Sequence, residues 1–487
     1  MALKDIKKSR AKKRYNLKTQ RKDPYPIYLK RTCSAADAHK NFKKFISGGK
    51  GTVLVGRMMT LREHGGSAFF DLRDGSGDFQ IYAKKDMLGD EAYNEFLEYF
   101  DIGDFVEATG ILFKTKRGEE TLELRSVKML AKSFLPLPEK WHGLTDVEER
   151  YRKRYLDLLM NDEVRQIFRT RSCIIASARN FLEMQGFMEV ETSILQPIPG
   201  GASARPFKTH LNALDMDLYL RVAPELDLKK LLVGGFEKVF EIGRSFRNEG
   251  MDHMHNPEFT SLEFYWAYSD YKEVMKFSEK LFAHIFKAIG VYPKLENEGN
   301  AINLKSPWPR VEFTVLFQKY LDIDYESLDR DALADRAKKL GVKVEKHLNK
   351  GQVADHIYKK AIRPKILEPT FVIHHPTELA PLAKPLLDNP KYDARFQLII
   401  NGWEVVNAFS ELNDPILQRE FFEAQEKQRV DGDEEAQRLD ETFLEALEYG
   451  MPPATGFAFG VDRLTALLTN SHSLREVILF PTMKPRE

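Results

Sequence analysis

The sequence predicts an α+β protein in which a small all-β barrel precedes a larger domain that mixes strands and helices. Five short β-like runs lie between Thr52 and Leu130, a long amphipathic helical pattern follows Asn161, and strand-like runs with polar ends recur after Glu241. A chain of 487 residues has room for two or three domains. The expected organisation is a basic N-terminal extension at 1–49, the barrel at 50–133, a linker at 134–150, and the larger domain at 151–487 with a helical insertion around 296–365.

Composition narrows the class of protein. The chain has 74 Lys plus Arg against 73 Asp plus Glu, a net charge of +1, so a nucleic-acid partner would have to bind local basic patches. The two cysteines, Cys33 and Cys173, cannot form a disulfide framework, which favours a reducing cytoplasm. No apolar run has the length of a signal peptide or a membrane span, so we expect no membrane partner.

The N-terminal segment is strongly basic. Residues 1–31 contain twelve Lys or Arg, with Asp5 and Asp23 as the only acids. Such an arm either contacts RNA phosphates or is a solvated, partly helical terminus, and the sequence leaves both interpretations open.

The five β-like runs, with a helical stretch at Asp86–Tyr99 between the third and the fourth, predict a small barrel of the oligonucleotide-binding (OB) type. Phe69, Gln80 and Arg57 are candidates to stack on and hydrogen-bond unpaired bases. Strand alternation puts only one of Phe69 and Phe70 outside, and the other belongs to the core.

Asn161 is an N-cap candidate for a helix whose apolar positions recur every three or four residues until Gly186. Residues 187–192 then read as a strand. So much apolar surface can pack within the domain or across a dimer.

Residues Glu241–Tyr265, EIGRSFRNEGMDHMHNPEFTSLEFY, read as strand, loop, strand. Arg247 and Glu249, two residues apart, share one strand face, and Phe259 adds a ring from the returning strand. This combination suits a nucleotide, with Arg247 for a phosphate, Glu249 for a base amino group and Phe259 for stacking.

Two further segments carry polar residues. Residues 395–412 predict two strands about a turn, with Asn407, Phe409 and Glu411 on one face, and carboxylates such as Glu404 beside a phosphate site suit Mg²⁺. Residues 456–464 predict a strand leading into a helix, with Arg463 at the junction to reach a phosphate or a base. No GxxxxGK[ST] pattern occurs, so a P-loop site is not expected.

The motifs FRNE…HNPEF, APEL at 223–226 and NAFSELNDP at 407–415 resemble those of the lysyl-tRNA synthetases, a family of class II aminoacyl-tRNA synthetases, and the similarity covers most of the chain. It implies a catalytic domain with an antiparallel sheet flanked by helices, an anticodon-binding barrel that uses Phe69 and Gln80, and a homodimer formed through the helix and strand after Asn161. It also implies ATP, L-lysine and tRNA(Lys) as partners and Mg²⁺ as the metal.

The resemblance also implies residue roles. Arg247 and Arg463 would be catalytic. The ATP-binding set would be Arg247, Glu249, His255, Asn256, Phe259, Glu404 and Arg463. The lysine-binding set would be Gly201, Glu225, Glu263, Tyr265, Asn407, Phe409 and Glu411. The tRNA-binding set would be Arg57, Phe69 and Gln80. The metal ligands would be Glu404 and Gln397.

Four positions depart from the family pattern. The family has proline at Ser193, tyrosine at Asp227, a metal-binding glutamate at Gln397 and glycine at Ala458. These departures keep open a non-catalytic RNA-binding paralogue, and a lysyl ligase acting on a protein or small molecule is a second alternative. The acidic pocket of Glu225, Glu263 and Glu411 favours a cationic substrate. We therefore expect a cytoplasmic lysine–tRNA ligase.

Overall fold

The computed structural model describes residues 2–48, 51–138, 144–346, 348–430 and 436–486. It forms two compact units, Met1–Leu144 and Thr145–Glu487. The linker signal Trp141-His142-Gly143 lies outside the described residues.

The N-terminal unit is a closed β-barrel. Its sheet order is β1-β5-β6-β4-β3-β2, and a further pairing of β1 with β3 closes it, as predicted for an OB-type domain. A short strand, β2, adds to the five expected runs. The elements are α1 (Leu3–Thr19), α2 (Ala35–Lys40), α3 (Phe42–Ser47), β1 (Thr52–Met58), β2 (Arg62–His64), β3 (Ser67–Arg73), β4 (Asp78–Lys84), α4 (Lys85–Leu88), α5 (Asp90–Tyr99), β5 (Phe105–Lys114) and β6 (Glu120–Ala131).

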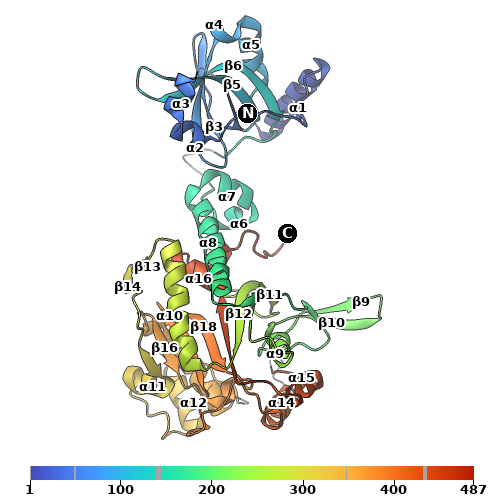
Figure 1. Cartoon of the computed structure of the whole chain (residues 1–487). Helices are drawn as coiled ribbons and strands as arrows, with labels where there is room; N and C mark the ends of the chain where they lie inside the picture. Colours follow the sequence, from blue (N-terminus) through green and yellow to red (C-terminus); the bar gives the residue numbers. More distant parts are fainter. Residues whose placement is uncertain (1, 49–50, 139–143, 347, 431–435, 487) are drawn as a thin grey trace. The chain divides into compact units, whose positions relative to one another are not determined.

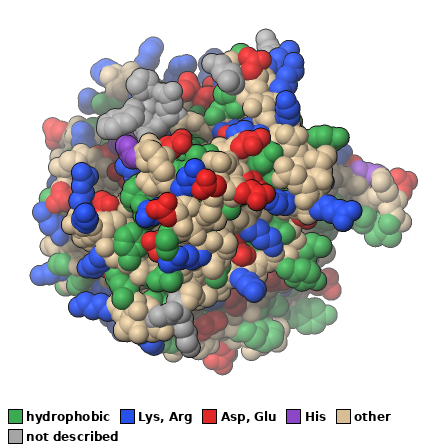
Figure 2. All heavy atoms as spheres, turned by 90° about the horizontal axis from the view of Figure 1, so that it is seen from above, with side chains coloured by type: hydrophobic (Ala, Val, Ile, Leu, Met, Phe, Trp, Pro, Cys, Tyr) green, Lys and Arg blue, Asp and Glu red, His purple; other side chains and the backbone are tan. Residues whose placement is uncertain are grey.

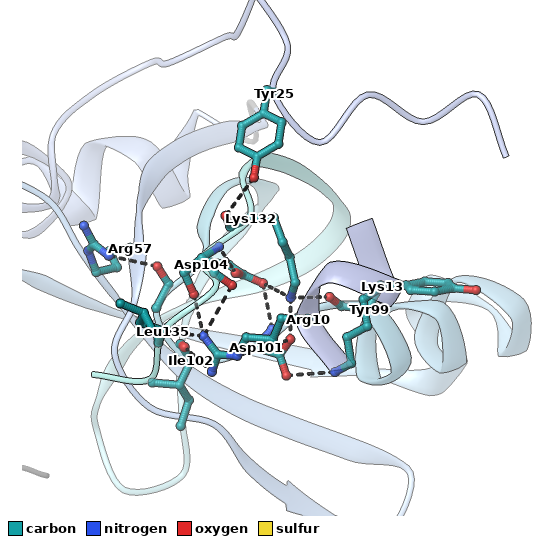
Figure 3. Close-up of polar contacts among 12 residues, drawn as sticks. Arg10, Lys13, Tyr25, Arg57, Tyr99, Asp101, Ile102, Asp104, Lys132 and Leu135 are labelled. Atoms are coloured by element: carbon teal, nitrogen blue, oxygen red, sulfur yellow. Dashed lines mark hydrogen bonds and ion pairs between the residues drawn. The ribbon is translucent and has the colours of Figure 1, made fainter. Parts of the chain in front are cut away.

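The basic N-terminal segment forms helix α1, which packs on the barrel. Arg10 is buried and donates hydrogen bonds to the Ile102 carbonyl at 3.0 Å and the Leu135 carbonyl at 3.1 Å, as Figure 3 shows. Lys13 pairs with Asp101 at 2.8 Å. Leu17, two turns after Arg10, is buried in the barrel core. The inner stripe of α1 therefore fixes the helix in place, and Lys4, Lys7, Lys8 and Lys12 are exposed.

The C-terminal unit is built on an eight-stranded sheet of order β15-β16-β17-β18-β19-β12-β11-β7. Its central pairs are antiparallel, and only the edge pairs β15–β16 and β7–β11 are parallel. The strands are β7 (Met188–Glu189), β11 (Lys238–Phe246), β12 (Glu258–Ala267), β15 (Arg310–Glu312), β16 (Thr370–Ile373), β17 (Arg395–Ile400), β18 (Trp403–Ser410) and β19 (Ala454–Gly460). Helices flank this sheet, which confirms the predicted fold class (Figure 1).

One face of the large sheet is covered by helices. α10 (Tyr271–Ala288) packs against strands β17, β18 and β19, and α8 (Asp162–Met184) and α16 (Val461–Leu468) pack beside it. Leu262 and Phe264 of β12 and Val406 and Ala408 of β18 enter this core. Because strand side chains alternate, Glu263, Tyr265, Asn407 and Phe409 of the same strands point to the opposite face.

The remaining elements form smaller groups. Helices α11 to α13 enclose a separate core, and α13 is followed by a π-helical turn and a 3₁₀ turn. These elements are α6 (Val147–Arg152), α7 (Arg154–Met160), β8 (Leu195–Gln196), β9 (Lys208–Leu211), β10 (Met216–Leu220), α9 (Glu225–Val233), β13 (Lys294–Asn297), β14 (Asn300–Asn303), α11 (Phe313–Leu321), α12 (Arg330–Lys339), α13 (Lys350–Ile357), η1 (Tyr358–Ile362), η2 (Arg363–Lys365), η3 (Thr377–Leu379), α14 (Pro415–Val430), α15 (Glu441–Glu448) and α17 (Leu474–Val477).

The surface reflects the near-zero net charge. On the face in Figure 2, basic and acidic side chains are interspersed. Cys33 and Cys173 are both free. Across the described part of the chain, no helix is both long and apolar enough to cross a bilayer.

Candidate active site

A cavity of about 400 Å³ opens on the face of the large sheet that α10 does not cover. Most of the side chains predicted for ATP, lysine and metal line it, although they come from segments far apart in the sequence. The predicted residues that line it are Gly201, Glu225, Arg247, Glu249, His255, Asn256, Phe259, Glu263, Tyr265, Gln397, Glu404, Asn407, Phe409 and Arg463. Glu411 does not line it, because its side chain is completely buried.

Strand register places these side chains in two rows across the sheet. One row is Glu263, Ala458, Asn407 and Gln397, and the next is Tyr265, Gly456, Phe409 and Arg395. The middle strand β19 contributes only small residues, so it forms the floor that leaves the cavity open. A Cβ atom at position 456 would collide with the Glu411 carboxylate and the Tyr265 ring, so this site requires glycine.

Arg247 follows the end of β11 and faces the cavity. Its guanidinium lies 5.0 Å from the centre of the Phe259 ring, and its Nε is buried without a hydrogen-bond partner among the described residues. Burial lowers the pKa of Arg247, which the carboxylate of Glu249 opposes. A buried, unsatisfied guanidinium donor beside an open cavity is suited to a phosphate or carboxylate ligand.

The loop between β11 and β12 supplies two further predicted residues. His255 is exposed and its Nδ1 lies 3.0 Å from Asp252 Oδ1. Asn256 is buried and donates from Nδ2 to the Glu258 carbonyl at 2.7 Å, while its Oδ1 has no partner among the described atoms.

Arg463 lies in the first turn of α16. The neighbouring Asp462 forms an ion pair with Arg171 of α8 and accepts a hydrogen bond from the Thr260 amide at 3.0 Å. These contacts fix the start of α16 against β12, so Arg463 enters the cavity from a rigid support.

The two predicted metal ligands lie on adjacent strands. Burial by itself would raise the pKa of Glu404, but the surrounding cations Arg463 and Arg363 lower it, so this carboxylate is ionised. Arg363 Nη1 donates to Glu404 Oε2 at 3.2 Å. Gln397 Oε1 is buried with no hydrogen-bond partner in the described structure. An ionised carboxylate and a free amide oxygen fit the oxygen ligands that Mg²⁺ prefers, alongside phosphate and water. Among the described residues, no group of three or more His, Cys, Asp or Glu side chains could hold a metal ion.

The acidic residues of the predicted lysine subsite surround a cation, Lys229, which was not among the residues predicted from the sequence. Lys229 of α9 is completely buried, donates to Glu225 Oε1 at 2.7 Å, and forms an ion pair with Glu411. Glu225 is the member of this group that reaches the cavity. Gly201, with φ of +88°, lies against Glu225, and a Cβ there would approach the Glu225 Cβ to 2.9 Å.

Glu263 is buried in the first row. Burial and the nearby Glu225 raise the pKa of Glu263 to about 8, and Arg247 opposes this shift only in part. Burial likewise raises the pKa of Tyr265 well above its usual value, so its hydroxyl stays protonated. This subsite therefore has a carboxyl group whose charge changes close to neutral pH.

Two functional candidates were missed from the sequence, Lys229 and Arg395. Arg395 lines the cavity and donates from Nε to Asn407 Oδ1 at 2.9 Å. Each had a signal: Lys229 is one helical turn after Glu225, and Arg395 is two residues before Gln397 on the same strand face. The structure therefore places an arginine beside the acidic residues of this pocket.

The predicted base-contacting residues lie together on the outer face of the barrel. Phe70 is in the core, whereas Phe69 is half-buried and stacks on Tyr82 with a ring distance of 4.6 Å. Gln80 is paired with Asp71 across the strands, and Arg57 with Arg73. Arg57 Nη1 donates to the Gly103 carbonyl at 3.0 Å.

Comparisons with known proteins agree on both units. The family described as "tRNA synthetases class II (D, K and N)" matches residues 146–484, and the one described as "OB-fold nucleic acid binding domain" matches 52–137. The chain is 48% identical to "Lysine--tRNA ligase" of Carboxydothermus hydrogenoformans over 486 residues, covering 100% of this chain and 99% of the relative. Relatives with the same name from Pelotomaculum thermopropionicum and Moorella thermoacetica are 47% and 46% identical, covering 96% and 98% of those proteins and 100% and 99% of this chain.

Proposed function

This chain belongs to the class II tRNA synthetases and, within them, to the lysine–tRNA ligases, and from that premise we propose how its residues activate L-lysine with ATP and transfer it to tRNA(Lys). The observation that carries the proposal is the single cavity in which the acidic group around Glu225 meets the cations Arg247 and Arg463. Carboxylates suit the lysine side chain, and the arginines suit phosphates.

In the first step, an oxygen of the lysine carboxylate forms a bond to the α-phosphorus of ATP. The bond from that phosphorus to the bridging oxygen breaks, and pyrophosphate leaves. Arg247 is assigned to bridge the α-phosphate and the lysine carboxylate. His255, Asn256 and Arg463 are assigned to the β- and γ-phosphates, with Glu249 and Phe259 on adenine. The protein contributes positioning and charge neutralisation here.

The lysine subsite is assigned to Glu225, Glu263, Tyr265 and the residues around them. Glu225 faces the cavity beside Gly201, and the first-row residues Glu263 and Asn407 offer a carboxyl and an amide. Lysine has two ammonium groups, and Glu225 and Glu263 offer one carboxyl group for each. Phe409 and the aliphatic part of the pocket wall would contact the methylene chain.

We assign Mg²⁺ to Glu404 and Gln397. When bound there, Mg²⁺ would neutralise phosphate charge as pyrophosphate leaves. Glu404 supplies the negative charge of this pair, and Gln397 supplies a neutral oxygen.

In the second step, the terminal ribose hydroxyl of tRNA attacks the lysyl carbonyl, and AMP leaves. The outer face of the barrel, with Phe69, Gln80 and Arg57, is assigned to the anticodon. An unpaired base can stack on Phe69, whose ring is already supported by Tyr82.

We also propose a homodimer. Apolar side chains stay exposed at the end of α8, at the edge strand β7 and just after it, as Met184, Met188, Ile194 and Leu195 show. An unpaired sheet edge next to exposed apolar residues is suited to a second copy of the chain. The proposed location is the cytoplasm, where the two free cysteines would stay reduced.

The test is lysine-dependent exchange of pyrophosphate into ATP, followed by charging of tRNA(Lys). Both activities should be present. Exchange without charging would favour a lysyl ligase with another acceptor, and the absence of exchange would favour a non-catalytic paralogue. The comparisons favour neither alternative, since the relatives match the whole length of the chain.

A further inference from the structure

Lys229 is enclosed by two carboxylates and two aromatic rings. Its Nζ contacts Glu225 and Glu411, and it lies 5.6 Å from the Phe409 ring centre and 5.8 Å from the Phe443 ring centre. The contact with Glu225 is local, within helix α9, whereas Glu411 follows β18 and is distant in the sequence. Lys229 therefore joins α9 to the end of β18 at the edge of the lysine subsite.

Lys229 acts on the ionisation of both carboxylates. Burial raises the pKa of Glu225 and of Glu411, and Lys229 opposes the shift in both. In return, the two carboxylates raise the pKa of Lys229 despite its burial, so its ammonium stays charged. Lys229 therefore favours the ionised form of Glu225, the carboxylate that reaches the cavity, whereas the pKa of Glu411 stays well above its usual value.

Other ionisable groups face this cluster from the neighbouring strands. Glu263 and Tyr265 come from β12, and Arg395 comes from β17. Arg395 favours the ionised form of Glu225, and Glu263 disfavours it when it is itself ionised. Lys229 is the only cation in direct contact with both Glu225 and Glu411 within the described residues.

We propose that Lys229 is a positioning residue that holds the Glu225 carboxylate ionised and in place at the cavity, so that Glu225 accepts one substrate ammonium, while Glu411 anchors Lys229 from the end of β18. This inference rests on the proposed function, because it concerns the same subsite. It makes Lys229 a determinant of specificity for a cationic amino acid although it does not line the cavity.

The first variant is Lys229→Met, which keeps an unbranched side chain between the two rings and removes the charge. Glu225, buried and without its cation, should then retain a proton at neutral pH. The KM for lysine in pyrophosphate exchange should rise by about tenfold or more at pH 7, which is the effect of one pKa unit, while the KM for ATP changes little. The lysine KM should recover as the pH rises towards 8.5, with an inflection at higher pH than in the wild type.

The second variant is Glu411→Gln, which removes the other partner of Lys229 and leaves the cation beside Glu225. Its lysine KM should be lower than that of Lys229→Met, and its inflection should not shift. A purely structural role for Lys229 predicts equal effects of the two variants, because each breaks the contact between α9 and the end of β18.

Lys230→Met is the matched control. Lys230 is the next residue of α9, lies partly exposed and pairs with Asp227 at 3.5 Å. It should leave both KM values unchanged.

Calorimetry gives a second readout. Lysine binding is measured in buffers of different ionisation enthalpy, which gives the number of protons released on binding. Lys229→Met should release more protons than the wild type.

The inference is overturned if folded Lys229→Met keeps the wild-type lysine KM, if lysine and ATP are affected equally, or if Glu411→Gln shifts the inflection as much as Lys229→Met does. Each of these outcomes requires an active wild-type enzyme. Absence of lysine-dependent exchange in the wild type would instead contradict the proposed function, so the two failures are distinguishable.

Discussion

Glu263 shows how a single buried side chain links stability to substrate binding. It lies in the first row of the sheet, and its pKa is raised from 4.5 to about 8. The folded protein therefore holds a proton between these pH values that the unfolded chain has released. In the absence of substrate, ionising this carboxyl destabilises the folded state, so its contribution to the free energy of unfolding falls as the pH rises.

The first prediction concerns this linkage. Between pH 4.5 and pH 8, the Glu263 carboxyl should lower the free energy of unfolding by up to about 1.4 kcal/mol per pH unit. Glu263→Gln removes the titration, so the variant should be as stable as the wild type near pH 5 and more stable at pH 8.5. Its lysine KM should rise, because an amide cannot pair with an ammonium. Urea denaturation of both proteins across this pH range is the measurement, and parallel stability curves would contradict the assignment.

The second prediction concerns Gln397. The amide oxygen can coordinate Mg²⁺ but brings no charge, so the ion would be held mainly by Glu404, ATP phosphates and water. Gln397→Glu should reduce the free Mg²⁺ needed for half-maximal exchange, and Glu404→Gln should be far more damaging. Mg²⁺ titrations of the three proteins provide the test. If wild type and Gln397→Glu share one midpoint, position 397 does not bind the metal.

At the scale of single elements, helix α1 has two faces with different roles. Arg10 and Leu17 fix its inner stripe to the barrel. The outer lysines are exposed and have no ion-pair partner among the described residues; these are Lys4, Lys7, Lys8 and Lys12. Arg10 and Arg57, the latter assigned to the anticodon, donate hydrogen bonds to the neighbouring carbonyls of Ile102 and Gly103 (Figure 3). The outer face of α1 is therefore a candidate extension of the nucleic-acid surface.

The third prediction tests this surface by substitution, since deletion of α1 would also remove core contacts of the barrel. Changing the four outer lysines to glutamine should weaken tRNA binding and reduce the slope of log K against log salt by about 0.9 for each lost duplex phosphate contact. Pyrophosphate exchange should be unchanged. The matched control changes four exposed lysines of α10, namely Lys272, Lys276, Lys280 and Lys287. Equal salt slopes for all proteins would favour a merely solvated face.

At the scale of the whole molecule, the proposed binding sites are divided between the two units. The residues assigned to the anticodon lie in the unit Met1–Leu144, and every residue assigned to ATP, lysine or metal lies in Thr145–Glu487. Under the proposed function, amino-acid activation needs only the cavity of the second unit, whereas charging needs both units.

The fourth prediction follows from this division. Phe69→Ala removes the stacking platform and should cost about 1–3 kcal/mol of tRNA binding, the usual value for one stacked base. Its KM for tRNA should rise, while lysine-dependent exchange stays at the wild-type rate. Phe70→Ala is a contrasting variant, because Phe70 is in the core and its loss should lower the thermal stability of the barrel. Loss of exchange in folded Phe69→Ala would contradict the separation of roles.

Much of the fold was predictable because its signals are local. The strand pair around FRNE, the strands at 395–412 and the strand before Arg463 were all predicted and are present as β11–β12, β17–β18 and β19. The barrel was predicted as well, although the three-residue strand β2 was too short to recognise. The strand expected at 187–192 contributes only Met188–Glu189 to the sheet, because β7 lies at its edge.

The sequence by itself determined which side chains share a strand face, since a period of two assigns Glu263 and Tyr265 to one face and Leu262 and Phe264 to the other. Only the tertiary structure decided which faces meet. The register of β12, β19, β18 and β17 aligns Glu263 with Gln397, and the packing of α9 brings Lys229 to Glu411. Local periodicity carries no information about such long-range pairings, because they depend on how separate elements pack to bury their apolar faces. The balance of charge in the lysine pocket is therefore a property of the folded chain.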